Sequence, residues 1–311
     1  MAALRYVAAA LALGLIALWG SEHLFNIAPG PDLTPTTWLL GWAVYALCAA
    51  AGLSAVAVSG LGGWRGVFLG GAVMGFALEG VITDSMYVEV PLHLVWTPLA
   101  WHALVTGLCI FGLGRASVHW RLGRQIAVWA VLGAAVGYFA LFWPLKRDDL
   151  PGAGAVVAYL LAGGLVVPLA HLVLDRLQTV PRPPLVLLPV APVLLALIWL
   201  SKMLATPEPI RLAAPVMIAL TLAVMARLGR PGAAVAFGAA APLWRHAVFL
   251  VAPLVTSVVA LGSWALIGSA ASDVVVTGLT VPLALALWLG LIGQAGWRLR
   301  RVIGALRRAR R

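Results

Sequence analysis

Residues 153–174 read AGAVVAYLLAGGLVVPLAHLVL, a run without a single Asp, Glu, Lys or Arg. A helix that crosses a bilayer needs about 20 mostly apolar residues, so this run is long enough to span one. The whole chain has a similar composition, because 63% of its 311 residues are hydrophobic and 10% are charged. An ordinary soluble domain has about 45–50% apolar and about 25% charged residues. The sequence therefore predicts an integral membrane protein and excludes a soluble enzyme, a disordered chain, a disulfide scaffold and a transcription factor.

Comparable apolar runs follow one another along the chain, at 2–20, 37–59, 66–85, 91–114, 126–144, 153–174, 185–204, 209–228, 245–268 and 273–295. In lipid every backbone polar group must be bonded within the chain, and these runs lack the alternation of a barrel strand. We therefore expect an all-α, polytopic helical bundle with about ten transmembrane helices. Residues 1–295 form a single transmembrane domain in this interpretation. The residues before Ser21 make a poor cleavage site, which favours a retained first helix over a signal peptide.

Basic residues alternate from one predicted loop to the next. With the N-terminus inside, the outer segments hold only four of the 21 Lys and Arg residues, namely Lys146, Arg147, Lys202 and Arg211. The positive-inside rule then predicts a multi-pass protein of the cell (inner) membrane with both termini cytoplasmic. The net charge of +11 follows from this pattern, so no nucleic-acid partner is expected.

Residues 296–311 form a basic tail. Leu299, Val302, Ile303 and Leu306 recur at helical spacing, and Arg fills the other face. The pattern predicts an amphipathic cytoplasmic helix that lies on anionic lipid. Docking of a partner protein is the alternative.

In this interpretation the transmembrane domain divides into two halves, residues 1–150 and 153–295. A proline-rich stretch at 181–184 lies between the sixth and seventh spans. The segment 98–103 reads PLAWHA and the segment 242–247 reads PLWRHA, which share the pattern P-L-x-x-H-A. Inverted repeats of this kind are common among transporters. A 5 + 5 inverted repeat and a chance match in a Leu- and Ala-rich chain both stay open. Gly71-x-x-x-Gly75 and Gly133-x-x-x-Gly137 predict closely packed helices.

Polar residues gather in one region, 79–102, which the topology places at the outer ends of the third and fourth spans. The region contains Glu79, Asp84, Tyr87, Glu89, His93, Trp96, Trp101 and His102. Glu22, His23, Asp148 and Asp149 lie at the same predicted level and are candidates to join it. Substrate contacts are assigned here to Tyr87, His93, Trp96, Trp101 and Asp84.

Glu79 lies deepest of these carboxylates, about 9 Å inside the outer end of its span. A charge at that depth is costly and usually marks a function or a partner. Either Glu79 is protonated, or it pairs with His102, the nearest candidate. The two differ in depth by roughly 7–8 Å on ideal helices, so contact requires a tilt or a bend, which Pro98 is placed to supply. Glu79 and His102 are the predicted catalytic or proton-carrying pair.

A metal site has weak support. His93 and His102 lie nine residues apart and so on opposite faces of one helix. The chain has no H-x-x-H, H-E-x-x-H or C-x-x-C pair, so no metal ligand is assigned and cofactors stay unknown. Cys48 and Cys109 lie at different predicted depths, which argues against a disulfide.

The remaining histidines are placed at inner ends. His171 is expected to bond locally to Asp175 at i+4, and His119 and His246 are expected on a solvated inner face.

Three functions remain open. The first is a secondary transporter or flippase-like carrier of a small or lipophilic substrate, with an outward-facing Glu/His site; the helix count is similar to that of ten-helix drug and metabolite transporters. The second is a membrane-embedded enzyme acting on a lipid or isoprenoid, with Glu79 as general acid. The third is a structural or assembly subunit, as a homo-oligomer or within a membrane complex.

One resemblance bears on the second function. Glu79-Gly80, Val90-Pro91-Leu92 and Pro98-Leu99-Ala100-Trp101 are similar to elements of carotenoid hydratase-type membrane proteins, at shorter spacing and over a small part of the chain. The resemblance implies an isoprenoid substrate.

Overall fold

The protein is an all-helical bundle. A computed structural model describes residues 1–30, 33–146 and 150–309, without the side chains of 302–304 and 306–309. The chain is 80% helical with no strands over the part described, where one isolated bridge pairs Thr179 with Ala236. The prediction of an all-α polytopic bundle is confirmed.

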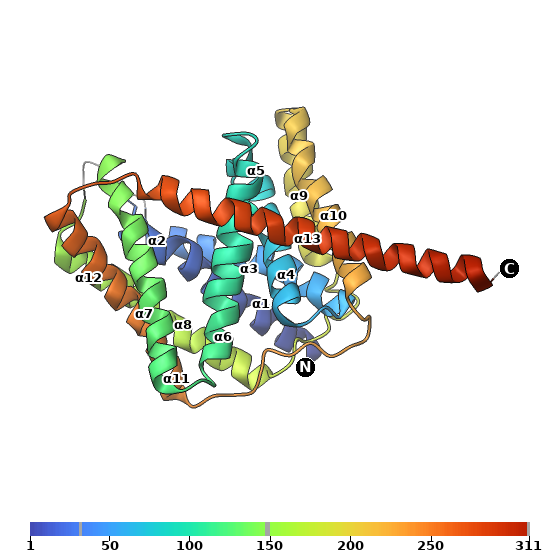
Figure 1. The fold of residues 1–311 in the computed structure, drawn as a ribbon, viewed down its shortest axis with the longest axis horizontal. Coiled ribbons are helices and arrows are strands. Elements are labelled where there is room, and N and C mark those ends of the chain that lie inside the picture. The colour runs from blue at the N-terminus through green and yellow to red at the C-terminus, as the bar shows by residue number, and fades with distance from the viewer. Residues whose placement is uncertain (31–32, 147–149, 310–311) are drawn as a thin grey trace.

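The first half contains five long helical segments, four of which change helix type along their length. Labels beginning with η denote π- or 3-10 helices (Figure 1). The segments are α1 (Ala2–Leu18) with η1 (Trp19–His23) and α2 (Leu24–Asn26); α3 (Pro35–Ser59); α4 (Gly63–Ala77) with η2 (Leu78–Ile82); α5 (His93–Val95) with η4 (Trp96–Leu113) and α6 (Gly114–Ser117); and α7 (Leu122–Phe139) with η5 (Ala140–Leu145). A short η3 (Ser85–Tyr87) lies in the loop before α5.

The second half contains α8 (Ala153–Leu177), α9 (Val190–Ala205), η6 (Pro209–Leu212) with α10 (Ala213–Leu228), α11 (Leu243–Ala247) with η7 (Val248–Leu250) and α12 (Val251–Leu266), and α13 (Ser272–Ala309). Within the described ranges, nine helical segments are long and apolar enough to cross a membrane. The expected span 185–204 is the exception, because α9 begins only after Pro189 and has 16 residues. At 1.5 Å per residue α9 is about 24 Å long, shorter than the roughly 30 Å hydrocarbon core.

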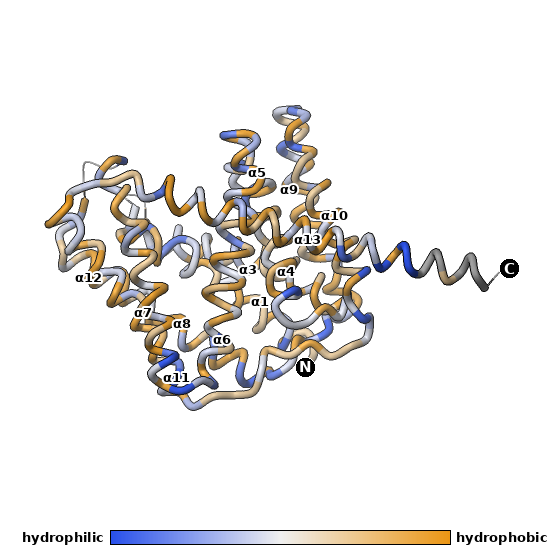
Figure 2. The backbone as a smooth tube through the Cα atoms, in the orientation of Figure 1, coloured by the Kyte–Doolittle hydropathy of each residue, from blue (hydrophilic) through white to orange (hydrophobic). Residues whose placement is uncertain are grey.

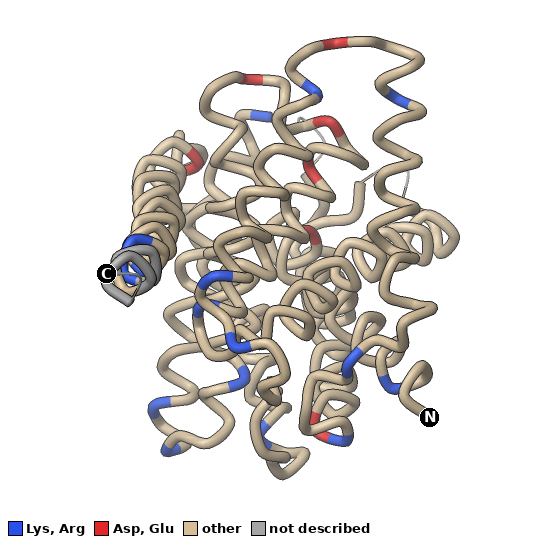
Figure 3. Tube along the Cα trace, turned by 90° about the vertical axis from the view of Figure 1, so that its right-hand side faces the viewer, with Lys and Arg blue, Asp and Glu red and all other residues tan. Residues whose placement is uncertain are grey.

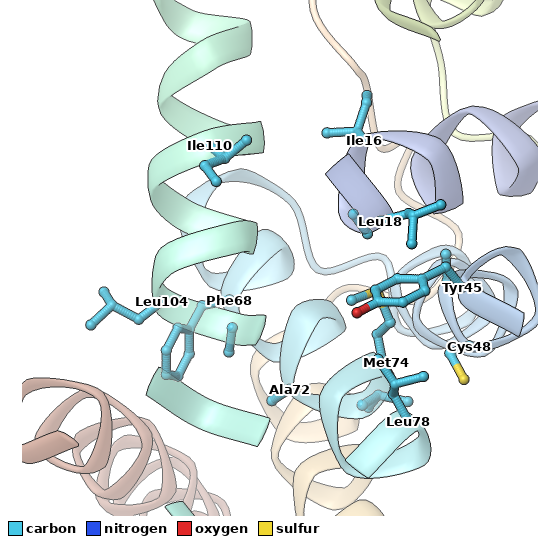
Figure 4. Packing of buried hydrophobic residues seen from close by; sticks show 14 of the residues in the cluster. Ile16, Leu18, Tyr45, Cys48, Phe68, Ala72, Met74, Leu78, Leu104 and Ile110 are labelled. Atoms are coloured by element: carbon cyan, nitrogen blue, oxygen red, sulfur yellow. The ribbon is translucent and has the colours of Figure 1, made fainter. Parts of the chain in front are cut away.

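Both predicted glycine motifs mediate close packing. A Cβ on Gly71 would lie 3.1 Å from the Cα of Ala103 in η4, and one on Gly133 would lie 2.4 Å from the carbonyl oxygen of Ala252 in α12. Figure 4 shows the apolar core that results in the first half, where α1, α3, α4 and η4 all contribute side chains.

Helix α13 crosses the bundle obliquely in front of η4 (Figure 1). Its first turn is fixed by Ser272 Oγ, which donates to the carbonyl of Phe139 at 2.8 Å. Further along, Arg298 Nη1 donates to the carbonyl of Leu228 at 3.0 Å. Helix α13 therefore bonds to the C-terminal end of α7 at its first turn and to the C-terminal end of α10 further along. A hydrophobic stretch longer than the bilayer is thick accommodates by such tilting.

Polar and charged residues are segregated. Figure 2 shows hydrophobic residues through most helices and hydrophilic ones mainly at their ends. Figure 3 shows most Lys and Arg at the end that carries the N-terminus and most Asp and Glu toward the opposite end. We call the end with the N-terminus the inner end and the other the outer end. The segregation has the form that the positive-inside rule predicts for a multi-pass membrane protein.

The basic tail continues α13 as helix to Ala309. Of its apolar pattern, the side chains of Val302, Ile303 and Leu306 lie outside the described residues. Docking of the tail on anionic lipid therefore stays a prediction.

Candidate functional site

Glu79 and His102 are in direct contact in the interior of the bundle. Glu79 Oε1 lies 2.7 Å from His102 Nε2, and the two side chains are 10% and 1% exposed. Of the two alternatives for Glu79, the structure shows pairing with histidine. A buried carboxylate needs such a partner, because an unpaired charge away from water is costly.

Both residues lie in π-helical turns, Glu79 in η2 and His102 in η4. A π-turn places an extra residue in the helix and so changes the direction of the side chains that follow; such turns are frequent at functional sites. Pro98, within η4, has no N–H to donate to the preceding turn. The departure from ideal helix geometry removes the expected difference in depth between the two side chains.

A chain of hydroxyl groups continues inward from His102. His102 Nδ1 lies 3.1 Å from Ser21 Oγ, and Ser21 Oγ lies 2.9 Å from Thr106 Oγ1. Ser21 lies in η1, Glu79 in η2, and both His102 and Thr106 in η4, so π-helical turns carry all four residues. The side chains of His102, Ser21 and Thr106 are buried.

The same chain continues outward from Glu79. Ser85 Oγ donates a short hydrogen bond to Glu79 Oε2, and Thr83 Oγ1 lies 2.8 Å from Ser85 Oγ. Thr83 is exposed at the outer loop. Together these contacts form what we call the relay: Thr83, Ser85, Glu79, His102, Ser21 and Thr106. Hydroxyl groups both donate and accept hydrogen bonds, so the relay is a continuous path along which a proton can be passed.

The aromatic residues expected at the site lie beside the relay. Trp101 Nε1 donates to the carbonyl of Ser21 at 3.2 Å, and the Trp96 ring lies 5.2 Å from the Trp101 ring. Phe25 and Phe139 complete this cluster, with ring centroids 4.3 and 5.4 Å from Trp101. The cluster shields the outer side of Ser21.

Asp84, Tyr87 and His93 lie at the outer loop and do not contact the Glu79–His102 pair. Asp84 Oδ2 pairs with Lys202 at 3.1 Å and Arg211 at 2.9 Å, which ties the loop to the second half. Tyr87 donates to the Gly80 carbonyl at 2.7 Å. Burial and, secondarily, the charge of Asp84 raise the pKa of Tyr87 to about 12. His93 Nδ1 lies 3.0 Å from the Ser85 carbonyl, so it supports the loop that carries Ser85.

Glu22 and His23 form a separate polar group. Tyr45 donates to Glu22 Oε1 at 2.5 Å, and Trp38 donates to His23 Nε2 at 2.7 Å. A cavity of about 320 Å³ adjoins this group. The Tyr45 ring lies 6.1 Å from the His102 ring, so the group borders the relay. Asp148 and Asp149, the other candidates, lie outside the described residues.

A second, larger cavity of about 630 Å³ reaches the relay from the inner side. It runs between α1, α3, α4 and η4, and its walls are mostly apolar. His102 and Thr106 line its deep end, whereas Arg115 and His119 line its inner end. Its lining residues, within the described part of the chain, do not include the outer loop 83–92. The relay therefore has a polar link to the outer end and an apolar cavity on its inner side.

A buried ionic cluster surrounds Asp175 near the inner end. Arg115 Nη1 lies 2.6 Å from Asp175 Oδ1, and His246 Nε2 lies 2.7 Å from Asp175 Oδ2. The amide of Ala241 donates to Asp175 Oδ2 at 3.1 Å. His102 and His246, which occupy matching positions of the P-L-x-x-H-A pattern, thus each bind a buried carboxylate; the inverted repeat itself stays a prediction.

Two expectations at this end are wrong. His171 does not bond to Asp175, because Arg115 and His246 occupy that carboxylate from other helices. Its ring stacks on His246 with centroids 5.8 Å apart, and its ring nitrogens find no hydrogen-bond partner among the described residues. His246 is completely buried and not solvated, since it turns toward Asp175. His119 is exposed, as expected.

Cys48 and Cys109 are free thiols. No group of three or more His, Cys, Asp or Glu in the described ranges is arranged to hold a metal ion.

Sequence reasoning missed the hydroxyl groups of the relay. Thr106 lies at i+4 from His102, whereas Ser21 and Ser85 had no signal, because a serine in or beside an apolar helix is common. A hydroxyl one turn from a buried histidine is the signal that would have indicated Thr106.

Comparison with known protein families, curated proteins and solved structures finds no match to this chain. The fold and the arrangement of the site are therefore the basis for proposing a function.

Proposed function

We propose that the protein is a secondary transporter that couples proton movement through the relay to the movement of a lipophilic or amphipathic substrate in the 630 Å³ cavity. The observation that carries the proposal is that His102 belongs to both structures. It contacts Glu79 at 2.7 Å and also lines the cavity. A change in its protonation therefore changes the charge on the cavity wall, next to any bound substrate.

The two sides of His102 differ in a way that suits coupling. Toward the outer end the path is polar and narrow, a chain of hydroxyls and one carboxylate. Toward the inner end the path is wide and apolar. Protons and substrate thus approach the same histidine by different routes. Intramembrane ionisable residues that pair with one another are typical of proton relays in transporters.

The volume and the lining of the cavity suit a substrate with an extended apolar chain. Ligand cavities commonly have volumes of about 300–1,000 Å³ and mostly apolar walls with few polar groups. Glycines from α3, α4 and η4 line this one, which leaves room where larger side chains would fill it.

The test uses purified protein in phosphatidylcholine vesicles with and without an imposed pH gradient. Three single-chain probes that carry a nitrobenzoxadiazole label are used: a lysophosphatidate, a lysophosphatidylcholine and a long-chain alcohol. Dithionite quenching reports the transfer of each probe between leaflets. We expect the gradient to accelerate the transfer of at least one probe, and Glu79→Gln to abolish the acceleration while keeping the hydrogen bonds of the site.

The matched control is Glu89→Gln, which makes the same change at an exposed carboxylate of the outer loop and leaves the acceleration intact. The proposal fails if none of the three probes responds to the gradient, or if Glu79→Gln responds like the wild type. Size-exclusion chromatography establishes that each variant is folded.

A membrane-embedded enzyme is the second candidate, and one observation favours it. Ser21, His102 and Glu79 form the order of hydroxyl, base and carboxylate that activates a nucleophile in acyl transfer. Against it, Ser21 does not line the cavity, whereas Thr106 does. A nucleophile must reach its substrate, so the relay role for Ser21 is better supported.

Mass spectrometry of host lipids separates these candidates. If the protein is an enzyme, Ser21→Ala and Glu79→Gln change the lipid profile and Thr106→Val does not. If it is a carrier, the covalent structures of the lipids are the same with all three variants, and each variant loses the response to the gradient.

A further inference from the structure

We infer that the inner end of the cavity binds the anionic head group of a single-chain amphipathic lipid, a phosphate or carboxylate, and that the chain of this lipid extends toward His102. The inference rests on the proposed function, since it names the substrate class of the same cavity. Two structural features support the inference, namely the first turn of α4 and the guanidinium group of Arg115.

The first turn of α4 is an open anion site. This 15-residue helix begins after Gly62, which provides no side-chain cap, and its first turn holds no acidic residue. The unbonded N–H groups and the helix dipole at such an end attract anions. Gly62, Gly63 and Trp64 all line the cavity. A Cβ built on Gly62 or Gly63 would meet no atom within 4 Å, so neither glycine is packed against a neighbouring segment on that side.

Arg115 supplies an independent observation. The residue is 7% exposed, lines the same cavity, and keeps Nη2 buried without a hydrogen-bond partner in the described part of the chain. Its other nitrogens are used, because Nε donates to the Phe237 carbonyl at 3.0 Å and Nη1 contacts Asp175 at 2.6 Å. A buried donor left unpaired is unfavourable, so an acceptor at Nη2 is favoured.

The packing of α4 against η4 brings these two features to the same end of the bundle. The helices are antiparallel: a Cβ on Gly75 would meet Pro98, and one on Gly71 would meet Ala103. Continuing this register places Gly63 near Phe111, about one turn before Arg115. Gly63 and Arg115 line the same cavity, so both are available to one head group.

Arg65, also in the first turn of α4, adds to the positive potential. A cation at a helix N-terminus opposes the helix dipole and is unfavourable there. Its Nε is also buried without a partner among the described residues. An anion bound in front of the first turn of α4 offsets the unfavourable interaction of Arg65 with the helix dipole. The nearby negative charge of Asp175 is already shared between Arg115, His246 and the amide of Ala241.

The rest of the cavity fits an apolar chain. Ile16, Leu53, Val67, Met74 and Phe111 line it between the two ends. Arg115 lies 13 residues after His102 along η4 and α6, so the two residues line opposite ends of the cavity. The head group then lies at the inner end, and the chain lies in the apolar interior, where burial of each CH₂ favours binding.

The test measures binding without any gradient, by the rise in thermal unfolding temperature of the purified protein in non-ionic detergent. The probes are hexadecyl phosphate, inorganic phosphate and hexadecanol. Gly62→Asp places a carboxylate in front of the α4 amides, and Gly62→Asn adds a cap of the same shape without charge. Gly62 has φ −97, which both residues adopt readily. Arg115→Gln is avoided because it removes the partner of Asp175.

We expect hexadecyl phosphate to stabilise the wild type and Gly62→Asn, and to bind Gly62→Asp roughly tenfold more weakly. Neither phosphate alone nor hexadecanol should match it. An equal effect of inorganic phosphate would show a site for the free anion and overturn the assignment to a lipid. An equal effect of hexadecanol, or no loss in Gly62→Asp, would overturn the head-group site.

This result is independent of transport. If hexadecyl phosphate binds as expected while Glu79→Gln vesicles behave like the wild type, the proton-coupled carrier fails and the anionic site stands. If transport responds to the gradient while Gly62→Asp binds normally, the reverse holds.

Discussion

Gly75 of α4 packs directly on Pro98 of η4, at a point where a Cβ on Gly75 would lie 2.4 Å from the Pro98 carbonyl oxygen and 2.9 Å from the His102 Cβ. The contact lies one turn before Glu79 along α4. The closeness of the two backbones is thus what allows the Glu79 and His102 side chains to meet. Small residues at helix contacts have this effect in membranes generally.

Gly75→Ala tests this contact. The added methyl group meets backbone atoms, so we expect a destabilisation of about 1–3 kcal/mol and loss of the response to a pH gradient. Gly290→Ala in α13 is the control, because its Cβ would meet nothing within 4 Å. It should leave stability unchanged or raise it by up to about 1 kcal/mol. Thermal unfolding in detergent measures both, and equal behaviour of the two variants would contradict the packing argument.

Asp175→Asn tests the inner ionic cluster. Removal of one partner from a buried ion pair leaves the other charge uncompensated, which typically costs about 3–5 kcal/mol. We expect Asp175→Asn to lower the unfolding temperature strongly. Glu208→Gln, at a carboxylate that is 58% exposed, should change stability by less than about 1 kcal/mol. The double variant Asp175→Leu/Arg115→Met should be less destabilised than Asp175→Leu alone; additive losses would argue against a coupled pair.

Ser21→Ala and Thr106→Val test the relay at its inner side. Each removes a hydroxyl from the chain, so both should slow gradient-driven transfer by roughly 10²-fold, the range of a lost proton-transfer group. Ser257→Ala is the control, because this buried serine bonds only locally, to the Pro253 carbonyl at 2.8 Å. The vesicle assay measures all three. Full activity in Thr106→Val would exclude the path from Ser21 to the cavity.

Tyr87 makes stability depend on alkaline pH. Burial raises its pKa to about 12, compared with about 10 in an unfolded chain. The folded state therefore keeps the proton that the unfolded state loses, and the stabilising contribution disappears as pH rises from 10 to 12. We expect stability to fall less steeply over this window in Tyr87→Phe than in the wild type. Thermal unfolding at pH 9 and pH 11.5 gives both slopes, and parallel slopes would contradict the assignment.

The sequence predicted the fold well, because its physical signals are long and redundant. Apolar runs of about 20 residues leave few alternatives to membrane helices. The glycine motifs also predicted close helix packing correctly, although not that the partners are η4 for α4 and α12 for α7. The span 185–204 was predicted too long, since hydropathy does not register that the proline-rich stretch delays the start of α9 until Val190.

The site was predicted only in part. Glu79 and His102 stood out because charge and imidazole are rare in apolar runs. Asp175 was expected to bond to His171, but its partners Arg115 and His246 lie 60 and 71 positions away in sequence. Local spacing pointed to His171, and only the packing of three helices shows otherwise. The cavity has no sequence signal, since it depends on what glycines leave empty.

The π-helical turns at 19–23 and 78–82 affect how these helices tolerate a change in length. Each accommodates one residue more per turn than an α-helix does. Removal of one residue from 80–82 would allow η2 to continue α4 as regular helix at little cost in apolar burial. The later side chains would keep their direction, because the regular turn closes over the place of the extra residue. One residue can thus be lost at such a turn without re-aiming the outer loop, whereas the same deletion within regular α-helix rotates every later side chain by about 100°.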